Sequence, residues 1–305
     1  MTKEEMYNDI NKWKKEKNAI ILAHYYQTGD IQDIADYVGD SLALAQKAAS
    51  TKADIIVFCG VHFMAETAKL LSPQKKVLLP VMEAGCVMAN MMAEKDIKKY
   101  REENPDTIIL MYVNSTARCK QYADVCVTSS NAMKIIDYYS KMGKKMLYCP
   151  DKNLGAYAME KSNIVMDLWP GFCGIHNGLK PEMVAKAKSQ WPNALFIAHP
   201  ECKKDVLNMA DYIGSTKQLI EYVESSNASE FIIGTEEGVI HEMQKRCPNK
   251  IFHLLNSSLR CFEMKLTKLE DLYNCLLNET NEIEIPDDVM TKARKCVDKM
   301  LELSK

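Results

Sequence analysis

The chain has 305 residues, of which 47% are hydrophobic, and its 39 basic residues nearly balance 41 acidic ones, leaving a formal charge of -2. This length is typical of about two domains with buried cores. The near-neutral charge excludes a protein whose whole surface binds nucleic acid or an anionic membrane.

The first residues, MTKEEMYNDINKWKKEK, are polar and lack the apolar segment of a secretory signal. Apolar runs such as residues 54–61 are much shorter than the roughly 20 residues that span a bilayer. The chain has 11 cysteines but no CxxC pair, which argues against a disulfide scaffold or a zinc ribbon. We therefore expect a soluble, cytoplasmic protein with neither a membrane nor a nucleic-acid partner.

One pattern occurs three times along the chain, starting at residues 19, 107 and 194. Each copy has an apolar run typical of a strand, a polar turn, a helical stretch, the pair Ala-Asp, a short apolar run, and a Ser or Thr that opens another helix. Successive copies lie 88 and 87 residues apart. The repeat therefore predicts three units rather than two domains.

Two more apolar runs follow in each copy, separated by helical stretches, and we interpret them as strands. They cover residues 54–60 and 75–81, 144–151 and 163–168, and 230–238 and 249–255. Strands alternating with helices predict an α/β protein of three homologous three-layer α/β/α units with short parallel sheets around a pseudo-threefold axis.

We place the units at residues 1–85, 86–172 and 173–260 and a C-terminal segment at 261–305. Within that segment, residues 265–279 and 286–304 are typical of helices, and we expect them to pack back on the first unit.

A cysteine follows the last strand of each unit, at Cys86, Cys173 and Cys261, with spacings of 87 and 88 residues. Equivalent positions meet near the axis, so three loops would bring three thiolates together. Three thiolates suit an iron–sulfur cluster with one open iron that acts as a Lewis acid, although the spacing also leaves a tri-cysteine zinc site open. The other eight cysteines follow no such period, and we interpret them as core or surface thiols.

Polar residues recur in pairs where the first strand of each unit ends. The pairs are His24 and Tyr26, Tyr112 and Asn114, and His199 and Glu201. Members of a pair are two residues apart and so point to one face of the strand. Ligands of α/β sheets bind beyond the carboxyl ends of the strands, which favours a substrate site here.

Three hydroxyl residues, Ser41, Ser129 and Thr216, open helices with the same period. They could be N-caps, ligands of an anionic substrate, or both. His176, three residues after Cys173, could be a donor beside the metal, a substrate ligand or a proton carrier. We interpret His62, His241 and His253, which have no equivalent in the other units, as structural.

The chain resembles the quinolinate synthase family from about residue 18 to 275. The resemblance rests on the three cysteines and on the segments AHYYQ, ADYVGDSL, FMAET, YVNST, PDKNLG, HPEC, YIGST and IGTEEG. It implies a cytoplasmic enzyme of de novo NAD biosynthesis that condenses iminoaspartate with dihydroxyacetone phosphate to quinolinate, phosphate and two waters. It also implies three related α/β domains with a central [4Fe–4S] cluster, and functional coupling to the enzyme that supplies iminoaspartate.

The resemblance also assigns roles to residues. Cys86, Cys173 and Cys261 would hold the cluster, and Tyr26, Glu201 and His176 would be catalytic. The substrate contacts would be His24, Ser41, Tyr112, Asn114, Ser129, His199, Glu201 and Thr216. Val87 and the segment CFEMK after Arg260 depart from common family residues, but neither change removes a ligand.

Two other functions remain alternatives at this point. The first is a zinc- or iron-dependent hydro-lyase or aldolase for an acidic metabolite, which shares the three-cysteine centre and needs no cluster. The second is a redox sensor that uses the cluster as an oxygen-sensitive switch. The acid–base residues around the axis argue against the sensor.

Overall fold

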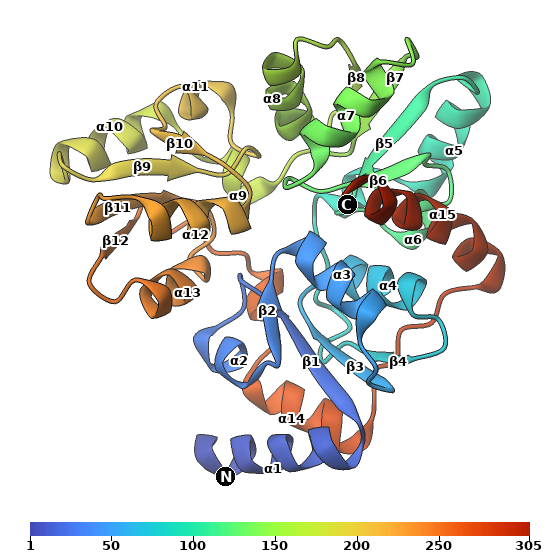
Figure 1. Ribbon diagram of the computed structural model, residues 1–305, viewed down its shortest axis with the longest axis vertical. Coiled ribbons are helices and arrows are strands. Elements are labelled where there is room, and N and C mark those ends of the chain that lie inside the picture. The colour runs from blue at the N-terminus through green and yellow to red at the C-terminus, as the bar shows by residue number, and fades with distance from the viewer.

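The strands of the computed structural model, which describes residues 1–305, form three separate sheets, each with four parallel strands. Figure 1 shows the sheets as three lobes around a common centre. The strand orders are β2-β1-β3-β4, β6-β5-β7-β8 and β10-β9-β11-β12, which is the same order in each lobe. The predicted three α/β units are therefore confirmed.

The elements of the first lobe are α1 (Lys3–Glu16), β1 (Ala19–His24), α2 (Gly29–Ile34), β2 (Tyr37–Gly39), α3 (Ser41–Ser50), β3 (Ile55–Cys59), α4 (His62–Leu71) and β4 (Lys76–Leu78). Those of the second are η1 (Ala89–Met91), α5 (Glu94–Glu103), β5 (Ile108–Tyr112), α6 (Ala117–Lys120), β6 (Val125–Val127), α7 (Ala132–Ser140), β7 (Met146–Cys149), α8 (Lys152–Ser162) and β8 (Asp167–Leu168). Those of the third are α9 (Gly174–Asn177), α10 (Pro181–Gln190), β9 (Leu195–Ala198), α11 (Lys204–Leu207), β10 (Tyr212–Ile213), α12 (Thr216–Ser225), β11 (Glu230–Gly234), α13 (Val239–Arg246) and β12 (Ile251–Leu254).

The short apolar run of each repeat is a fourth strand, at the sheet edge, which the sequence pattern did not reveal. The aspartate of the Ala-Asp pair explains its register. Asp36 accepts a hydrogen bond from the backbone N–H of Ile21 at 2.8 Å, and its own N–H donates to the carbonyl of Ile21 at 3.0 Å. Asp124 and Asp211 make the same two bonds with the first strands of their units.

A cation from the preceding helix pairs with each of these aspartates. Lys14 of α1 contacts Asp36, Arg101 of α5 contacts Asp124, and Lys188 of α10 contacts Asp211. The three cations are themselves 87 residues apart in each step. Helix, first strand and edge strand are thus joined by the same arrangement in all three units.

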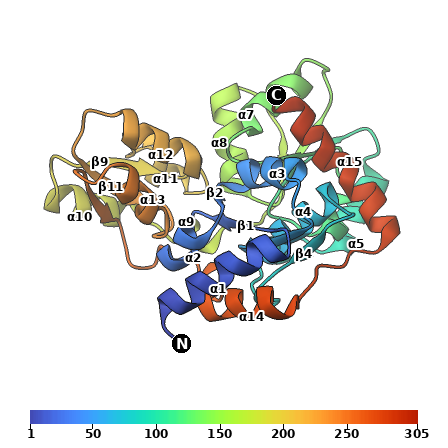
Figure 2. The same ribbon diagram turned by 60° about the horizontal axis from the view of Figure 1, so that its bottom comes forward.

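The C-terminal segment contains η2 (Glu263–Lys265), α14 (Leu269–Asn278) and α15 (Asp287–Leu303). α14 packs on α1 and β3 of the first lobe, as expected. α15 instead packs mainly on α6 and β6 of the second lobe and on α4 of the first (Figure 2), because its buried apolar face completes a core that these two lobes share. The expectation that the whole tail packs on the first unit is therefore wrong for α15.

The third lobe has buried clusters of its own, mostly on the two faces of its sheet. Its link to the other lobes is formed largely at the centre, where loops from all three meet. None of the helices is both long enough and apolar enough to cross a bilayer.

Candidate active site

The loops at the centre of the molecule enclose a cavity of about 210 Å³. The first strand of each lobe, β1, β5 and β9, ends at this cavity, and so do the starts of α3 and α12. Its lining includes every predicted site residue except His176, which is 1% exposed and lies directly behind it. No lysine or arginine lines the cavity, so an anion would be held there by N–H and O–H groups and helix N-termini.

All three phased cysteines line this cavity. Cys86 lies after β4, Cys173 directly before α9 and Cys261 after β12, so each lobe's last strand leads to one thiol. Burial raises the pKa of Cys86 to about 11, that of Cys261 to about 12, and that of Cys173 well above its ordinary value. Burial raises the pKa of core cysteines such as Cys59 and Cys202 as well. The position of the three thiols around one cavity is therefore the feature that fits a metal-holding donor set.

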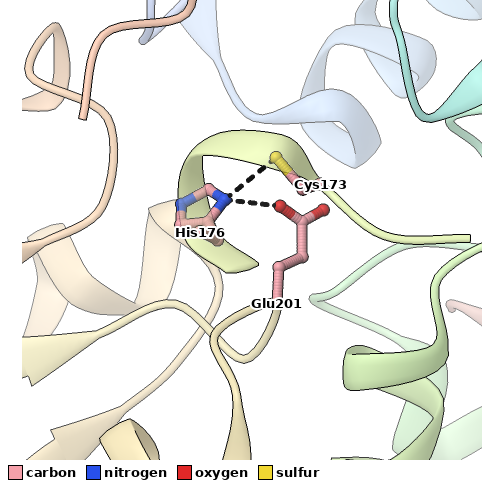
Figure 3. Close-up of side chains that lie close together, drawn as sticks. All are labelled: Cys173, His176 and Glu201. Atoms are coloured by element: carbon pink, nitrogen blue, oxygen red, sulfur yellow. Dashed lines mark hydrogen bonds and ion pairs between the residues drawn. The ribbon is translucent and has the colours of Figure 1, made fainter. Parts of the chain in front are cut away.

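A tighter group lies at Cys173, where ligand atoms of Cys173, His176 and Glu201 are within 4.8 Å of one another (Figure 3). Its nitrogen and oxygen atoms already have partners, because His176 Nδ1 lies 2.8 Å from Glu201 Oε2 and His176 Nε2 lies 3.0 Å from Thr235 Oγ1. We therefore interpret His176 and Glu201 as a hydrogen-bonded pair beside the metal site. The three thiols, which come from three lobes, suit the corners of a cluster better than one shared ion.

His24 and His199 occupy equivalent places at the ends of β1 and β9 and have the same tautomer. The backbone N–H of Tyr26 donates to His24 Nδ1 at 3.1 Å, and that of Glu201 donates to His199 Nδ1 at 3.3 Å. Burial lowers the pKa of His24 to about 3 and that of His199 to about 4. Both rings are therefore neutral with the proton on Nε2. His24 can donate this N–H to a substrate oxygen, while His199 Nε2 lies 3.3 Å from Ser129 Oγ, so these two groups would contact a substrate together.

Glu201 is a buried carboxylate with two donors. Tyr112 Oη donates to Oε1 at 2.8 Å, and His176 Nδ1 donates to Oε2. Burial raises the pKa of Glu201, but His199, His176 and the Tyr112 hydroxyl lower it by more, so the group is ionised. An ionised carboxylate that lines the cavity is able to accept a proton from a bound substrate.

Tyr26 joins this group through a residue that the sequence did not single out. Its hydroxyl lies 2.8 Å from Thr235 Oγ1 and 3.1 Å from Thr216 Oγ1. His176 Nε2 lies 3.0 Å from the same Thr235 Oγ1, so Thr235 joins Tyr26 to His176 and, through it, to Glu201. Thr235 stands in the segment IGTEEG, which carried part of the family resemblance.

The hydroxyls at the helix starts are not N-caps. Asp40 caps α3 by accepting from the N–H of Ala43, Ser215 caps α12, and Ser129 lies in the turn before α7. Ser41 and Thr216 are instead the first residues of their helices and line the cavity. The capping interpretation is therefore wrong, because the preceding residue has the extended backbone that a cap requires. Because these hydroxyls make no capping hydrogen bond, they can bind an anion.

Asn114 also lines the cavity, and its buried Oδ1 has no hydrogen-bond partner. The turn that carries it is held by Lys120, a fully buried cation whose Nζ donates to the carbonyls of Val113 and Ser115. A buried acceptor without a partner is costly, which favours a ligand that donates to it.

The remaining histidines and cysteines lie outside the cavity, as expected. His241 pairs with Asp33 at 2.8 Å and His253 with Glu230 at 2.7 Å, while His62 lies 3.9 Å from Glu66. Of the eight other cysteines, seven are buried, and Cys247 is partly exposed.

Comparison with known proteins places this arrangement in a family. The family model described as quinolinate synthetase A protein matches residues 8–302. A quinolinate synthase of Caldicellulosiruptor saccharolyticus is 48% identical over 99% of both chains. One of Alkaliphilus metalliredigens is 47% identical over 99% of this chain and 100% of its own, and one of Clostridium perfringens is 47% identical over 98% and 99%.

Proposed function

This chain belongs to the quinolinate synthetase A family, and we propose how its central cavity carries out the family's reaction. The chain is an enzyme that forms quinolinate in NAD biosynthesis, and its cofactor is a [4Fe–4S] cluster. The full-length match removes the zinc enzyme and the redox sensor as alternatives. The proposed substrates are iminoaspartate and dihydroxyacetone phosphate, and the products are quinolinate, phosphate and two waters.

Cys86, Cys173 and Cys261 are the proposed cluster ligands. One observation carries this assignment: three cysteines in phase with the repeat, one from each lobe, line a single cavity together with Glu201. When bound, the cluster supplies an open iron that acts as a Lewis acid on a substrate oxygen.

The proposed anion contacts are the three hydroxyls and the two histidines around the cavity. Ser41 and Thr216 add their O–H groups to the positive ends of α3 and α12, and Ser129 adds a third hydroxyl. His24 and His199 each supply an Nε2–H. This donor set suits a substrate with two carboxylates and one with a phosphate, and it does so without a cationic side chain.

Glu201 is the proposed base. The condensation removes protons from carbon and releases two waters, so it needs a group that accepts protons and a group that returns them. Tyr112 and Tyr26 keep their hydroxyl protons, since burial raises the pKa of both well above the ordinary value. Glu201 Oε2 already accepts the Nδ1–H of His176 at 2.8 Å, so a proton taken by Glu201 stays on the carboxylate until it returns to the substrate, and the hydroxyl of Tyr26, which Thr235 joins to His176, is a second donor.

The experiment that tests this proposal is replacement of each cluster cysteine. We expect Cys86→Ser, Cys173→Ser and Cys261→Ser, purified without oxygen, to lose most iron and sulfide and to form no quinolinate. Cys247→Ser, which changes a partly exposed thiol outside the cavity, serves as the matched control and should retain both. A full, active cluster in any of the three variants would contradict the ligand assignment.

The unit boundaries at residues 85, 172 and 260 are also proposed. Each boundary separates the last strand of one lobe from its cysteine, so each cysteine loop would belong to the segment that follows it. From the family resemblance we further propose a cytoplasmic location and functional coupling to the enzyme that supplies iminoaspartate.

A further inference from the structure

Two buried carboxylates occupy equivalent positions in the second and third lobes. Leu147 of β7 pairs with Ile109, and Ile232 of β11 pairs with Phe196. Ile109 and Phe196 are equivalent residues of the repeat, so Leu147 and Ile232 are equivalent as well. Asp151 and Glu236 each stand four residues after these strand residues, and both are fully buried.

Each of these carboxylates binds the backbone of one proposed cluster cysteine. One oxygen of Asp151 accepts from the N–H of Asn153 at 2.8 Å, and the other accepts from the N–H of Cys173 at 3.2 Å. Glu236 repeats the pattern: one oxygen accepts from the N–H of Gly238 at 2.7 Å, and the other from the N–H of Cys261 at 3.0 Å. Both groups thus tie a strand end to a cysteine loop that lies more than twenty residues further along the chain.

The surroundings of the two carboxylates differ in charge. Lys265, which is nearly buried, contacts Glu236 Oε1 at 2.9 Å, and it also donates to the backbone carbonyl of Tyr26. Asp151 has no cation and is held by backbone N–H groups alone. Through Lys265, the Cys261 loop is also connected to the segment that carries Tyr26.

The first lobe has no such carboxylate. Val57 of β3 pairs with Ile21, and four residues further on stands Val61, a buried apolar residue. The backbone N–H of Cys86 makes no hydrogen bond within the protein, although the Cys86 carbonyl accepts from Asn90. The Cys86 loop therefore lacks the anchor that the other two loops have.

We infer that Asp151 and Glu236 are positioning residues for the cluster, each fixing the backbone of one cysteine. The inference rests on the proposed ligand set. Groups that orient metal ligands typically change metal affinity by about 10- to 100-fold when they are removed. An amide at either position keeps the shape but offers one acceptor oxygen where the carboxylate uses two.

The test uses the full chain, purified without oxygen, with Asp151→Asn and Glu236→Gln. We expect both variants to lose iron to a chelator about tenfold faster than the unchanged chain. Glu66→Gln is the matched control, because Glu66 is a buried carboxylate that accepts a backbone N–H, that of Ala117, away from the cysteines. It should lose iron at the unchanged rate.

A second readout separates positioning of the cluster from a general effect on folding. A cysteine whose backbone is no longer held in place should shift the midpoint potential of the cluster and alter the electron paramagnetic resonance spectrum of the reduced cluster. Unchanged iron loss, potential and spectrum in both variants would overturn the inference, even if the variants melt at a lower temperature. Should Asp151→Asn fail to fold, Glu236→Gln decides the question alone, since the two carboxylates are equivalent.

The cysteine variants distinguish this failure from failure of the ligand assignment. If Cys173→Ser loses its cluster while Asp151→Asn behaves like the unchanged chain, the inference is wrong and the ligand set stands. If Cys173→Ser keeps a full cluster, the ligand set is wrong and the inference is overturned with it.

Discussion

His176 Nδ1 lies 2.8 Å from Glu201 Oε2, and both side chains are almost completely buried, at 1% and 5% exposure. The pair joins two parts of the site, since His176 also lies 3.2 Å from the Cys173 sulfur and Glu201 lines the substrate cavity. The carboxylate therefore accepts a proton at a place that is shielded from bulk water and lies beside a proposed cluster ligand.

Glu201→Gln should lower kcat by about 10²- to 10⁴-fold, because an amide cannot accept the proton that the carboxylate takes. The amide can still accept from Tyr112, so the KM values should change little. Quinolinate formation and iron content, both measured without oxygen, check this. Glu230→Gln, which alters an ion pair with His253 outside the cavity, should leave kcat as it is. Unchanged turnover in Glu201→Gln would remove Glu201 from proton transfer.

Asp124→Ala should destabilise the second lobe by about 1–3 kcal/mol, because the N–H of Ile109 loses its acceptor inside the sheet. Arg101 also loses its partner. Urea unfolding measures the change. The equivalent variant Asp211→Ala should behave alike, whereas Asp137→Ala, which removes an exposed pair with Lys141, should have almost no effect. A loss below about 0.5 kcal/mol for both Asp124→Ala and Asp211→Ala would contradict this role of the repeat.

These aspartates show what the sequence could and could not predict. The period of the repeat placed the three lobes, the three cysteines and the polar pairs, because equivalent residues occupy equivalent places. The edge strands escaped prediction since β2, β6 and β10 have only two or three residues each. Asp36, Asp124 and Asp211 were visible in the repeat, but their role depends on strand pairing that no local pattern reveals.

Other residues carry no signal that recurs in all three units. Asp151 and Thr235 act through contacts between distant segments, whereas Lys120 binds two carbonyls of the turn just before it. The repeat does not preserve these residues in all three units: Val61, for example, replaces the carboxylate in the first. The site was predictable where the three lobes are alike. The site was not predictable where the lobes have diverged, as at Asp151 and Thr235.

The pH dependence of stability should reflect His24. Burial, with smaller effects from His199 and Lys265, lowers the pKa of His24 to about 3, whereas an unfolded histidine titrates near 6.5. Between these values the unfolded chain binds a proton that the folded chain does not. The contribution of neutral His24 to the stability of the fold is therefore complete above about pH 6.5 and is lost as the pH falls toward 3.

Lowering the pH from 7 to 5 should reduce the free energy of unfolding by about 2 kcal/mol through His24, at roughly 1.4 kcal/mol for each pKa unit. Urea unfolding of the cluster-free chain at both pH values measures the loss, which should be smaller by that amount in His24→Gln. Gln244→Ala, which changes an exposed side chain that does not titrate, should show the same loss as the unchanged chain. An equal loss in His24→Gln would show that this histidine is not buried in its neutral form.

Thr235→Val should lower kcat by roughly tenfold, the equivalent of about 1.4 kcal/mol for a lost hydrogen bond, while iron content stays constant. The hydroxyl of Thr235 is the only link between Tyr26 at 2.8 Å and His176 Nε2 at 3.0 Å, so valine, which has nearly the same shape, interrupts the chain of donors that ends at Glu201. Thr235→Ser restores the hydroxyl and should recover most of the activity. If Thr235 contributed only through the packing of its methyl group, the serine variant, which lacks that group, would lose activity and the valine variant would keep it. Equal activity of the valine variant and the unchanged chain would mean that Tyr26 and Glu201 act on the substrate independently.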